Sequence, residues 1–101
     1  MGLLDFLFRK QKRDIQYFKS KGAIILDVRS RREYKKGHII GSENVPIADL
    51  HQKVILLKTT KKPFIVCCAS GVRSAKAVKF LLINGIEATN GGSYQTLKRL
   101  L

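Results

Sequence analysis

The chain has 101 residues, of which 45% are hydrophobic, and its 20 lysines and arginines against 7 acidic residues give a net charge of +13. A chain of this length supports one hydrophobic core, and its hydrophobic fraction excludes a disordered protein. The two cysteines occupy adjacent positions, which excludes a disulfide-stabilised scaffold. The longest apolar stretches are far shorter than the roughly 20 residues of a membrane-spanning helix. We therefore expect a single domain over residues 1–101.

Residues 1–21 are predicted to form an amphipathic, basic helical segment ahead of a core at residues 22–101. Apolar residues recur there at helical spacing, and basic residues follow them. These apolar residues are Leu3, Leu4, Leu7 and Phe8. The segment lacks the basic start and small-residue cleavage site of a secretory signal, so we expect a cytoplasmic protein, with thiols kept reduced. Two alternatives stay open for the apolar face: packing on the domain's own core, which we favour, or contact with a membrane surface or a partner.

The core is predicted to begin with a buried strand and a short helix. Residues 23–28 form an apolar run with β-branched members, as in a strand that is buried on both faces. Ser30 then offers an N-cap for a helix over residues 31–36, with Glu33 completing a capping box. Gly37 ends this helix.

The middle of the chain is predicted to add two strands and a helix. A short strand is expected at residues 42–45, between glycines and a proline. Residues 48–57 have the apolar spacing of a helix, and residues 63–67 read as a second buried strand.

The last third is predicted to contain a helix, a strand and a closing helix. Residues 74–82 place their apolar side chains on one helical stripe, and Asn84 with Gly85 ends that helix. A strand at residues 86–89, a tight turn at the following glycine pair and a helix at residues 94–101 complete the chain. Strands that alternate with helices indicate an α/β fold, a small parallel sheet with helices on both faces and its site at the carboxyl ends of the strands.

The strongest chemical signal is Cys68, which ends an apolar strand and is followed by a short loop and a helix start. A thiol of ordinary pKa is only a few per cent ionised at neutral pH. Backbone amides that curl round the sulfur, with the N-terminus of the next helix, would favour the thiolate, and Gly71 permits the required backbone angles. The predicted anion-binding loop consists of Ala69, Ser70, Gly71, Val72 and Arg73, the last a fixed cation. The predicted loop supports are Asp27, Arg29 and Ser74, with Asp27 pairing with Arg29 or Arg73.

Residues 68–74, C-A-S-G-V-R-S, resemble the active-site loop of rhodanese-like sulfurtransferases. The segments L-D-V-R at 26–29, E-Y at 33–34, the stretch at 37–46 and G-G-S-Y at 91–94 resemble that family's other signatures in order and spacing. The resemblance implies a single-domain rhodanese fold with a parallel sheet of about five strands. It also implies that the Cys68 thiolate takes a sulfane sulfur as a persulfide and passes it to cyanide or a thiol.

The length of the loop separates two chemistries that share this architecture. Cys68 to Arg73 spans six residues, as in the sulfurtransferases, whereas the related phosphatases and arsenate reductases carry one residue more. Many thiosulfate-using members have a basic residue just after the cysteine, where this chain has Ala69 and Ser70. We therefore expect weak thiosulfate turnover, with a polysulfide or a protein persulfide as donor, and a small thiol or a thioredoxin-like protein as acceptor.

The remaining candidate residues have structural interpretations. Cys67 is expected to point to the other face of the sheet as a small hydrophobic residue, and a bridge to its neighbour would be strained. His38 is interpreted as a hydrogen-bonded structural residue and His51 as a surface residue. Two distant histidines and one cysteine pair lack metal-ligand spacing, so we expect no metal and no cofactor.

The positive charge is spread along the chain and is not interleaved with exposed aromatic residues, so we expect no nucleic-acid binding. A field of this sign would steer anionic sulfur donors or acidic partners to the site. The alternative function left open is a non-catalytic module of the same fold that recruits an acidic partner. The intact nucleophile loop argues against that alternative.

Overall fold

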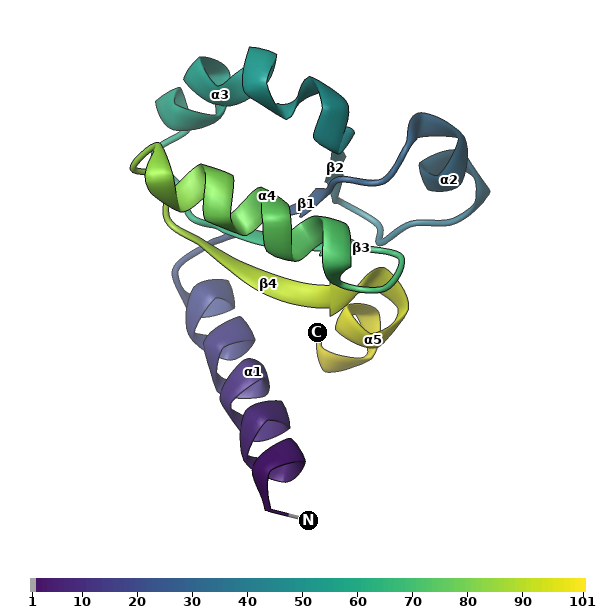
Figure 1. Cartoon of the computed structure of the whole chain (residues 1–101), viewed down its shortest axis with the longest axis vertical. Coiled ribbons are helices and arrows are strands. Elements are labelled where there is room, and N and C mark those ends of the chain that lie inside the picture. The colour runs from purple at the N-terminus through teal and green to yellow at the C-terminus, as the bar shows by residue number, and fades with distance from the viewer. Residues whose placement is uncertain (1) are drawn as a thin grey trace.

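The computed structural model describes residues 2–101 as a parallel sheet between two layers of helices (Figure 1). The strands are β1 (Ile24–Asp27), β2 (Glu43–Asn44), β3 (Phe64–Cys68) and β4 (Ala88–Ser93). The helices are α1 (Leu3–Ser20), α2 (Arg31–Lys36), α3 (Leu50–Thr59), α4 (Val72–Ile83) and α5 (Tyr94–Leu100), with a 3-10 turn at Ile47–Asp49. The predicted α/β class with a small parallel sheet is confirmed.

The sheet has the order β2-β1-β3-β4, so that β1 and β3 are its central strands. All five residues of β3 are buried, which explains its continuous apolar sequence. Asp27 pairs with Cys67 in the register of β1 and β3. The carboxyl ends of the central strands therefore bring Asp27 and the cysteine pair to one edge of the sheet.

Each face of the sheet has its own hydrophobic core. On one face, α3 and α4 cover the sheet through Leu50, Leu57, Ala77 and Leu81. On the other face, α1 contributes Ile15 and α5 contributes Leu97. Successive residues of β3 alternate between the two cores, so that neighbouring residues of the strand face different surroundings.

The local signals near α2 and around the central strands match the structure. Ser30 caps α2, accepting from the Glu33 amide while the Glu33 carboxylate accepts from the Ser30 amide, so the predicted capping box is confirmed. The strands predicted at residues 23–28, 42–45 and 63–67 each lie within one residue of the observed bounds.

The prediction for the last strand was wrong in its bounds. The glycine pair that we read as a tight turn lies inside β4, where Gly92 pairs with Cys67 and the register shifts by one residue. A Cβ at Gly91 would lie 2.9 Å from Leu97 Cδ2 and 3.0 Å from Ile65 Cγ2. Gly91 is therefore needed for the close approach of α5 to the sheet, and not for a reversal of the chain.

The number of strands also differs from the expectation of about five, because residues 2–101 contain four. The chain ahead of β1 is the helix α1, which packs its second half on the sheet through Ile15. None of the helices described is long and apolar enough to cross a membrane.

Candidate active site

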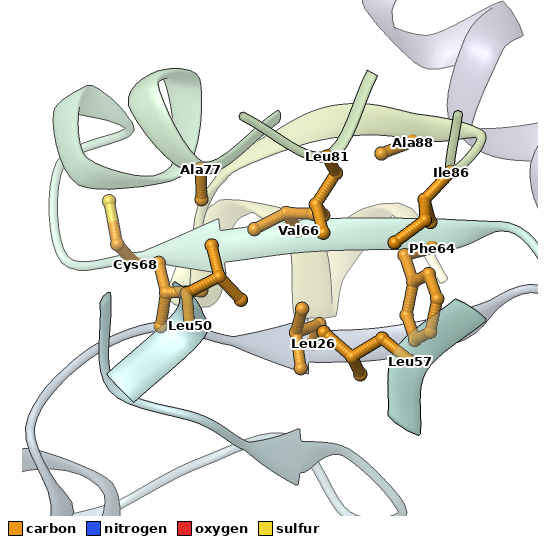
Figure 2. Close-up of a cluster of buried hydrophobic side chains, with 11 residues drawn as sticks. Leu26, Leu50, Leu57, Phe64, Val66, Cys68, Ala77, Leu81, Ile86 and Ala88 are labelled. Atoms are coloured by element: carbon orange, nitrogen blue, oxygen red, sulfur yellow. The ribbon is translucent and has the colours of Figure 1, made fainter. Parts of the chain in front are cut away.

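Cys68 is the last residue of β3 and lies directly before the loop that leads into α4. Figure 2 shows its side chain pointing toward the beginning of α4. The loop residue Gly71 has φ +96°, a left-handed conformation that residues with a side chain rarely adopt. A Cβ at Gly71 would also lie 3.4 Å from the backbone of Gly92. Glycine at this position lets the loop close tightly over the sulfur.

Three hydrogen-bonding groups surround the sulfur of Cys68. The backbone N–H of Gly71 donates to Sγ at 3.0 Å, and the backbone N–H of Ser74 donates at 3.3 Å. The Ser74 hydroxyl lies 3.3 Å from the same atom. The sequence had indicated loop amides as the cradle for an anion, and the structure places the amides of Gly71 and Ser74 on the sulfur itself.

The hydrogen-bond donors around the sulfur control the ionisation of Cys68. Burial acts to raise its pKa, but the Ser74 hydroxyl and the amides of Ser74, Gly71 and Ser70 outweigh burial, so the pKa of Cys68 lies below the ordinary 9.0. The sulfur also lies at the N-terminal end of α4, where the aligned peptide dipoles favour an anion. This arrangement favours a thiolate, the form in which cysteine is a nucleophile.

Asn90, on β4, forms hydrogen bonds with the residues that surround the Cys68 sulfur. Its Oδ1 accepts from the Ser74 hydroxyl at 2.7 Å and from the Gly92 amide at 2.9 Å. Its Nδ2 donates to the Gly71 carbonyl at 3.1 Å. We did not predict a role for Asn90, although an asparagine that bonds the backbone two residues later is a recurrent local motif and N-G-G was a signal for it.

The Ser74 hydroxyl connects Asn90 to the reactive sulfur. The Ser74 hydroxyl has one proton, which it donates to Asn90 Oδ1. While it does so, the neutral Cys68 thiol is the donor in the 3.3 Å contact between Cys68 Sγ and the Ser74 oxygen. When Cys68 ionises, the Ser74 O–H is the group that turns to the thiolate. Asn90 Oδ1 then keeps the Gly92 N–H as its donor. The cradle therefore accommodates both protonation states without leaving a buried polar atom unpaired.

Asp27 and Arg29 form a buried pair at the carboxyl end of β1, and the hydrogen bonds of Arg29 beyond Asp27 go to the backbone of residues 33 and 37 rather than to the predicted loop at 69–73. Arg29 Nη2 lies 2.7 Å from Asp27 Oδ2, and the Asp27 carboxylate also accepts from the Arg29 Nε and backbone amide. Arg29 donates further to the Gly37 carbonyl at 2.7 Å and stacks on the Tyr94 ring at 3.8 Å. The hydrogen bonds that Arg29 donates to Asp27 raise the pKa of Arg29 despite its burial. Of the two partners considered for Asp27, the structure selects Arg29.

Arg73 turns away from the sulfur and binds α2. Its two terminal nitrogens donate to the Glu33 carboxylate at 2.7 and 2.9 Å. Arg73, followed by the Ser30 amide, lowers the pKa of Glu33 to about 2. We had expected Arg73 to add a fixed cation at the loop, and the structure pairs its charge with a carboxylate 40 residues away in sequence. Sequence spacing gave no signal for this pair.

The other candidate residues lie where structural roles were expected. Cys67 packs with Ile39, Ile65 and Leu97 on the opposite face, and burial raises its pKa to about 12. His38 donates from Nδ1 to the Tyr34 carbonyl at 2.8 Å and stacks on the Tyr34 ring. His51 is exposed. Within residues 2–101, no three His, Cys, Asp or Glu side chains gather as metal ligands would.

Comparison with known proteins identifies relatives of this arrangement. The family model of the rhodanese-like domain matches residues 12–96. The chain is 38% identical over 63 residues to an uncharacterized protein of Bacillus subtilis, covering 62% of the chain and 49% of that protein. It is 34% identical over 75 residues to a thiosulfate sulfurtransferase of Pseudomonas fluorescens, covering 71% of the chain and 65% of the relative. The chain thus spans less than two thirds of either relative.

A solved structure agrees with the same assignment. The crystal structure of a rhodanese-related protein from Thermoplasma volcanium superposes with a TM-score of 0.72 and 34% sequence identity. The superposition covers 87% of each chain. The similarity therefore extends over most of the fold.

Proposed function

Since the chain belongs to the rhodanese-like domain family, we propose that it is a sulfurtransferase in which Cys68 carries a sulfane sulfur as a persulfide. The observation that supports this proposal is the position of the Cys68 sulfur, which receives two backbone N–H groups and lies beside the Ser74 hydroxyl at the start of α4. Donors aimed at a sulfur favour the thiolate that starts the reaction and also suit the terminal anion of a persulfide.

The proposed reaction has two displacement steps. In the first step, the Cys68 thiolate attacks the outer sulfur of a donor such as thiosulfate, a new S–S bond forms, and sulfite leaves with the electrons of the broken S–S bond. In the second step, the thiolate of an acceptor attacks the terminal sulfur of the Cys68 persulfide. The acceptor then carries the persulfide, and Cys68 returns as a thiolate. Cyanide can replace the thiol acceptor and leaves as thiocyanate.

The surroundings of the loop support a preference among donors. Ala69 and Ser70 bring no charge, and the Arg73 guanidinium is bound to Glu33. A dianionic donor therefore meets backbone amides and no unpaired arginine at the loop. We propose that the donors are small sulfane-sulfur anions and protein persulfides, with polysulfide used better than thiosulfate. A small thiol or a thioredoxin-like protein is the proposed acceptor.

Intact-protein mass spectrometry after brief incubation with polysulfide, and separately with thiosulfate, tests this proposal. We expect a gain of one sulfur that a reductant removes, and peptide mapping should place it on Cys68. Cys68→Ser should abolish both the adduct and sulfur transfer to cyanide.

Cys67→Ala is the matched control, because it removes the neighbouring thiol without placing a hydroxyl in an apolar cluster. This variant should keep the adduct and most of the activity. An adduct on Cys67, or a folded protein with free thiols that takes up sulfur from neither donor, would overturn the proposal.

A further inference from the structure

The first turns of α1 extend beyond the body of the protein and leave their apolar side chains uncovered (Figure 1). The side chains of Leu3, Leu4, Phe6, Leu7 and Phe8 are between 49% and 77% exposed. Ile15, two turns later on the same helix, is fully buried. The domain therefore covers the second half of α1 and leaves the first half projecting by about 12 Å, given the rise of an α-helix.

The uncovered residues continue the helix face that packs on the sheet. Leu4, Phe8, Gln11, Ile15 and Phe18 follow one another at spacings of three and four residues, which places them on one side of α1. Gln11 marks the end of the covered part, since its side chain donates to the Asn90 carbonyl at 3.4 Å. Ahead of Gln11, Leu7 and Phe8 border an open hollow beside Asn90 of β4, and about half of each side chain stays exposed.

Positive charge accompanies this apolar face. Four cations lie within five residues, Arg9, Lys10, Lys12 and Arg13. Lys10 pairs with Asp14 at 3.0 Å, and with Asp5 and Asp14 counted the segment 3–14 has a net charge of 4 − 2 = +2. A second copy of this chain is a poor occupant, because each copy carries +13. A projecting helix with leucine and phenylalanine on one side and lysine and arginine beside them has the pattern of a helix that lies in the surface of an anionic bilayer.

We propose that the N-terminal half of α1 binds the surface of an anionic lipid bilayer, with Leu3, Leu4, Leu7 and Phe8 in the headgroup region and Arg9, Lys12 and Arg13 on the lipid charges. Apolar contact and charge each contribute too little alone, so both are needed for stable binding. The Gln11 contact with Asn90 places this helix beside the residues that hold the Cys68 loop. Binding would therefore bring the active-site edge of the sheet toward the lipid. The proposal does not depend on the proposed sulfurtransferase activity.

Co-sedimentation of the full chain with vesicles tests the proposal. We expect binding at low salt to vesicles that contain phosphatidylglycerol, little binding to pure phosphatidylcholine, and weaker binding as salt rises. Leu4→Ser combined with Phe8→Ser should reduce binding at least about tenfold, since it removes apolar side chains from the lipid. The matched control is Ile55→Ser with Leu56→Ser, two exposed apolar residues on α3, which should leave vesicle binding unchanged.

Circular dichroism should show that all four substituted positions leave the fold intact, because each side chain is exposed. The proposal is overturned if the chain does not sediment with phosphatidylglycerol vesicles at low salt, or if both double variants bind as the unaltered chain does. It is also overturned if soluble polyglutamate displaces the chain and the α1 variant is displaced equally, because charge alone would then explain binding. A dimer in analytical ultracentrifugation that the α1 variant abolishes would assign the surface to a second copy.

Discussion

Cys67 and Cys68 are adjacent in β3 and equally buried, but the two faces of the sheet surround them with different chemistry. Cys67 lies among apolar side chains beneath α1 and α5. Cys68 lies beneath the loop of residues 69–73 and the first turn of α4, where the amides of Gly71 and Ser74 point at its sulfur. Burial disfavours the thiolate at both positions, and only Cys68 has donors that reverse that effect.

The comparison shows that burial alone does not decide whether a cysteine is reactive. The same low-dielectric surroundings that raise the pKa of Cys67 also strengthen each hydrogen bond to Cys68. The two sites also differ in how they are covered. Two helices cover Cys67, whereas Ala69 and Ser70 over Cys68 are exposed loop residues.

The largest expected effect is a difference in alkylation rate between the two thiols. At pH 7 to 8 iodoacetamide should modify Cys68 at least about 100-fold faster than Cys67, because alkylation requires the thiolate. The Cys68 rate should rise with pH and level off below the ordinary thiol pKa of 9.0, whereas the pKa of Cys67 is about 12. Peptide mapping at timed intervals gives both rates. Equal rates in the folded protein would remove the distinction between the two faces.

A smaller effect is expected from Ser74→Ala, which removes the side-chain hydroxyl that contacts the Cys68 sulfur. Loss of this hydrogen bond should raise the pKa of Cys68 and lower its alkylation rate at pH 7 about tenfold, the change that corresponds to one pKa unit. The pH profile of alkylation separates this result from a general loss of structure, because the midpoint itself should move upward.

Ser70→Ala is the matched control for Ser74→Ala. Its hydroxyl lies in the same loop and accepts from the Val72 amide, at 3.5 Å, rather than contacting the sulfur. This variant should leave the alkylation profile unchanged. If both serine variants shift the midpoint by the same amount, the rigidity of the loop and not the Ser74 hydroxyl would control Cys68.

The sequence predicted those features of the site that depend on residues close together in the chain. A few consecutive residues are enough to predict Cys68 at the end of a strand, Gly71 in a left-handed turn and the Ser30 capping box. Asp27 and Arg29 are two residues apart, and Arg29 was one of the two partners that the sequence offered for Asp27. The contacts of Asn90 with Ser74 and of Glu33 with Arg73 were missed because the partners lie 16 and 40 residues apart, respectively. The register shift in β4 was misread because glycines that permit close packing look, in sequence, like glycines of a turn.

The smallest expected effect concerns Glu33, which neutralises the only arginine of the loop. Glu33→Gln removes the carboxylate, while the glutamine oxygen can still accept from the Ser30 amide and preserve the capping box. Arg73 would then be an unpaired cation near the site, and we expect the KM for thiosulfate to fall about threefold with kcat unchanged. Glu87→Gln, which breaks the comparable exposed pair with Lys21, is the control and should leave KM unchanged.

Because the pKa of Glu33 is lowered to about 2, its ion pair stabilises the fold above pH 4.5 and this contribution disappears as the pH falls toward 2. Acid unfolding of Glu33→Gln should accordingly lack part of that pH dependence, with a stability loss at neutral pH below about 1 kcal/mol for an exposed pair. An unchanged KM together with the altered acid transition would mean that Arg73 stabilises the packing of α2 and takes no part in attracting the donor.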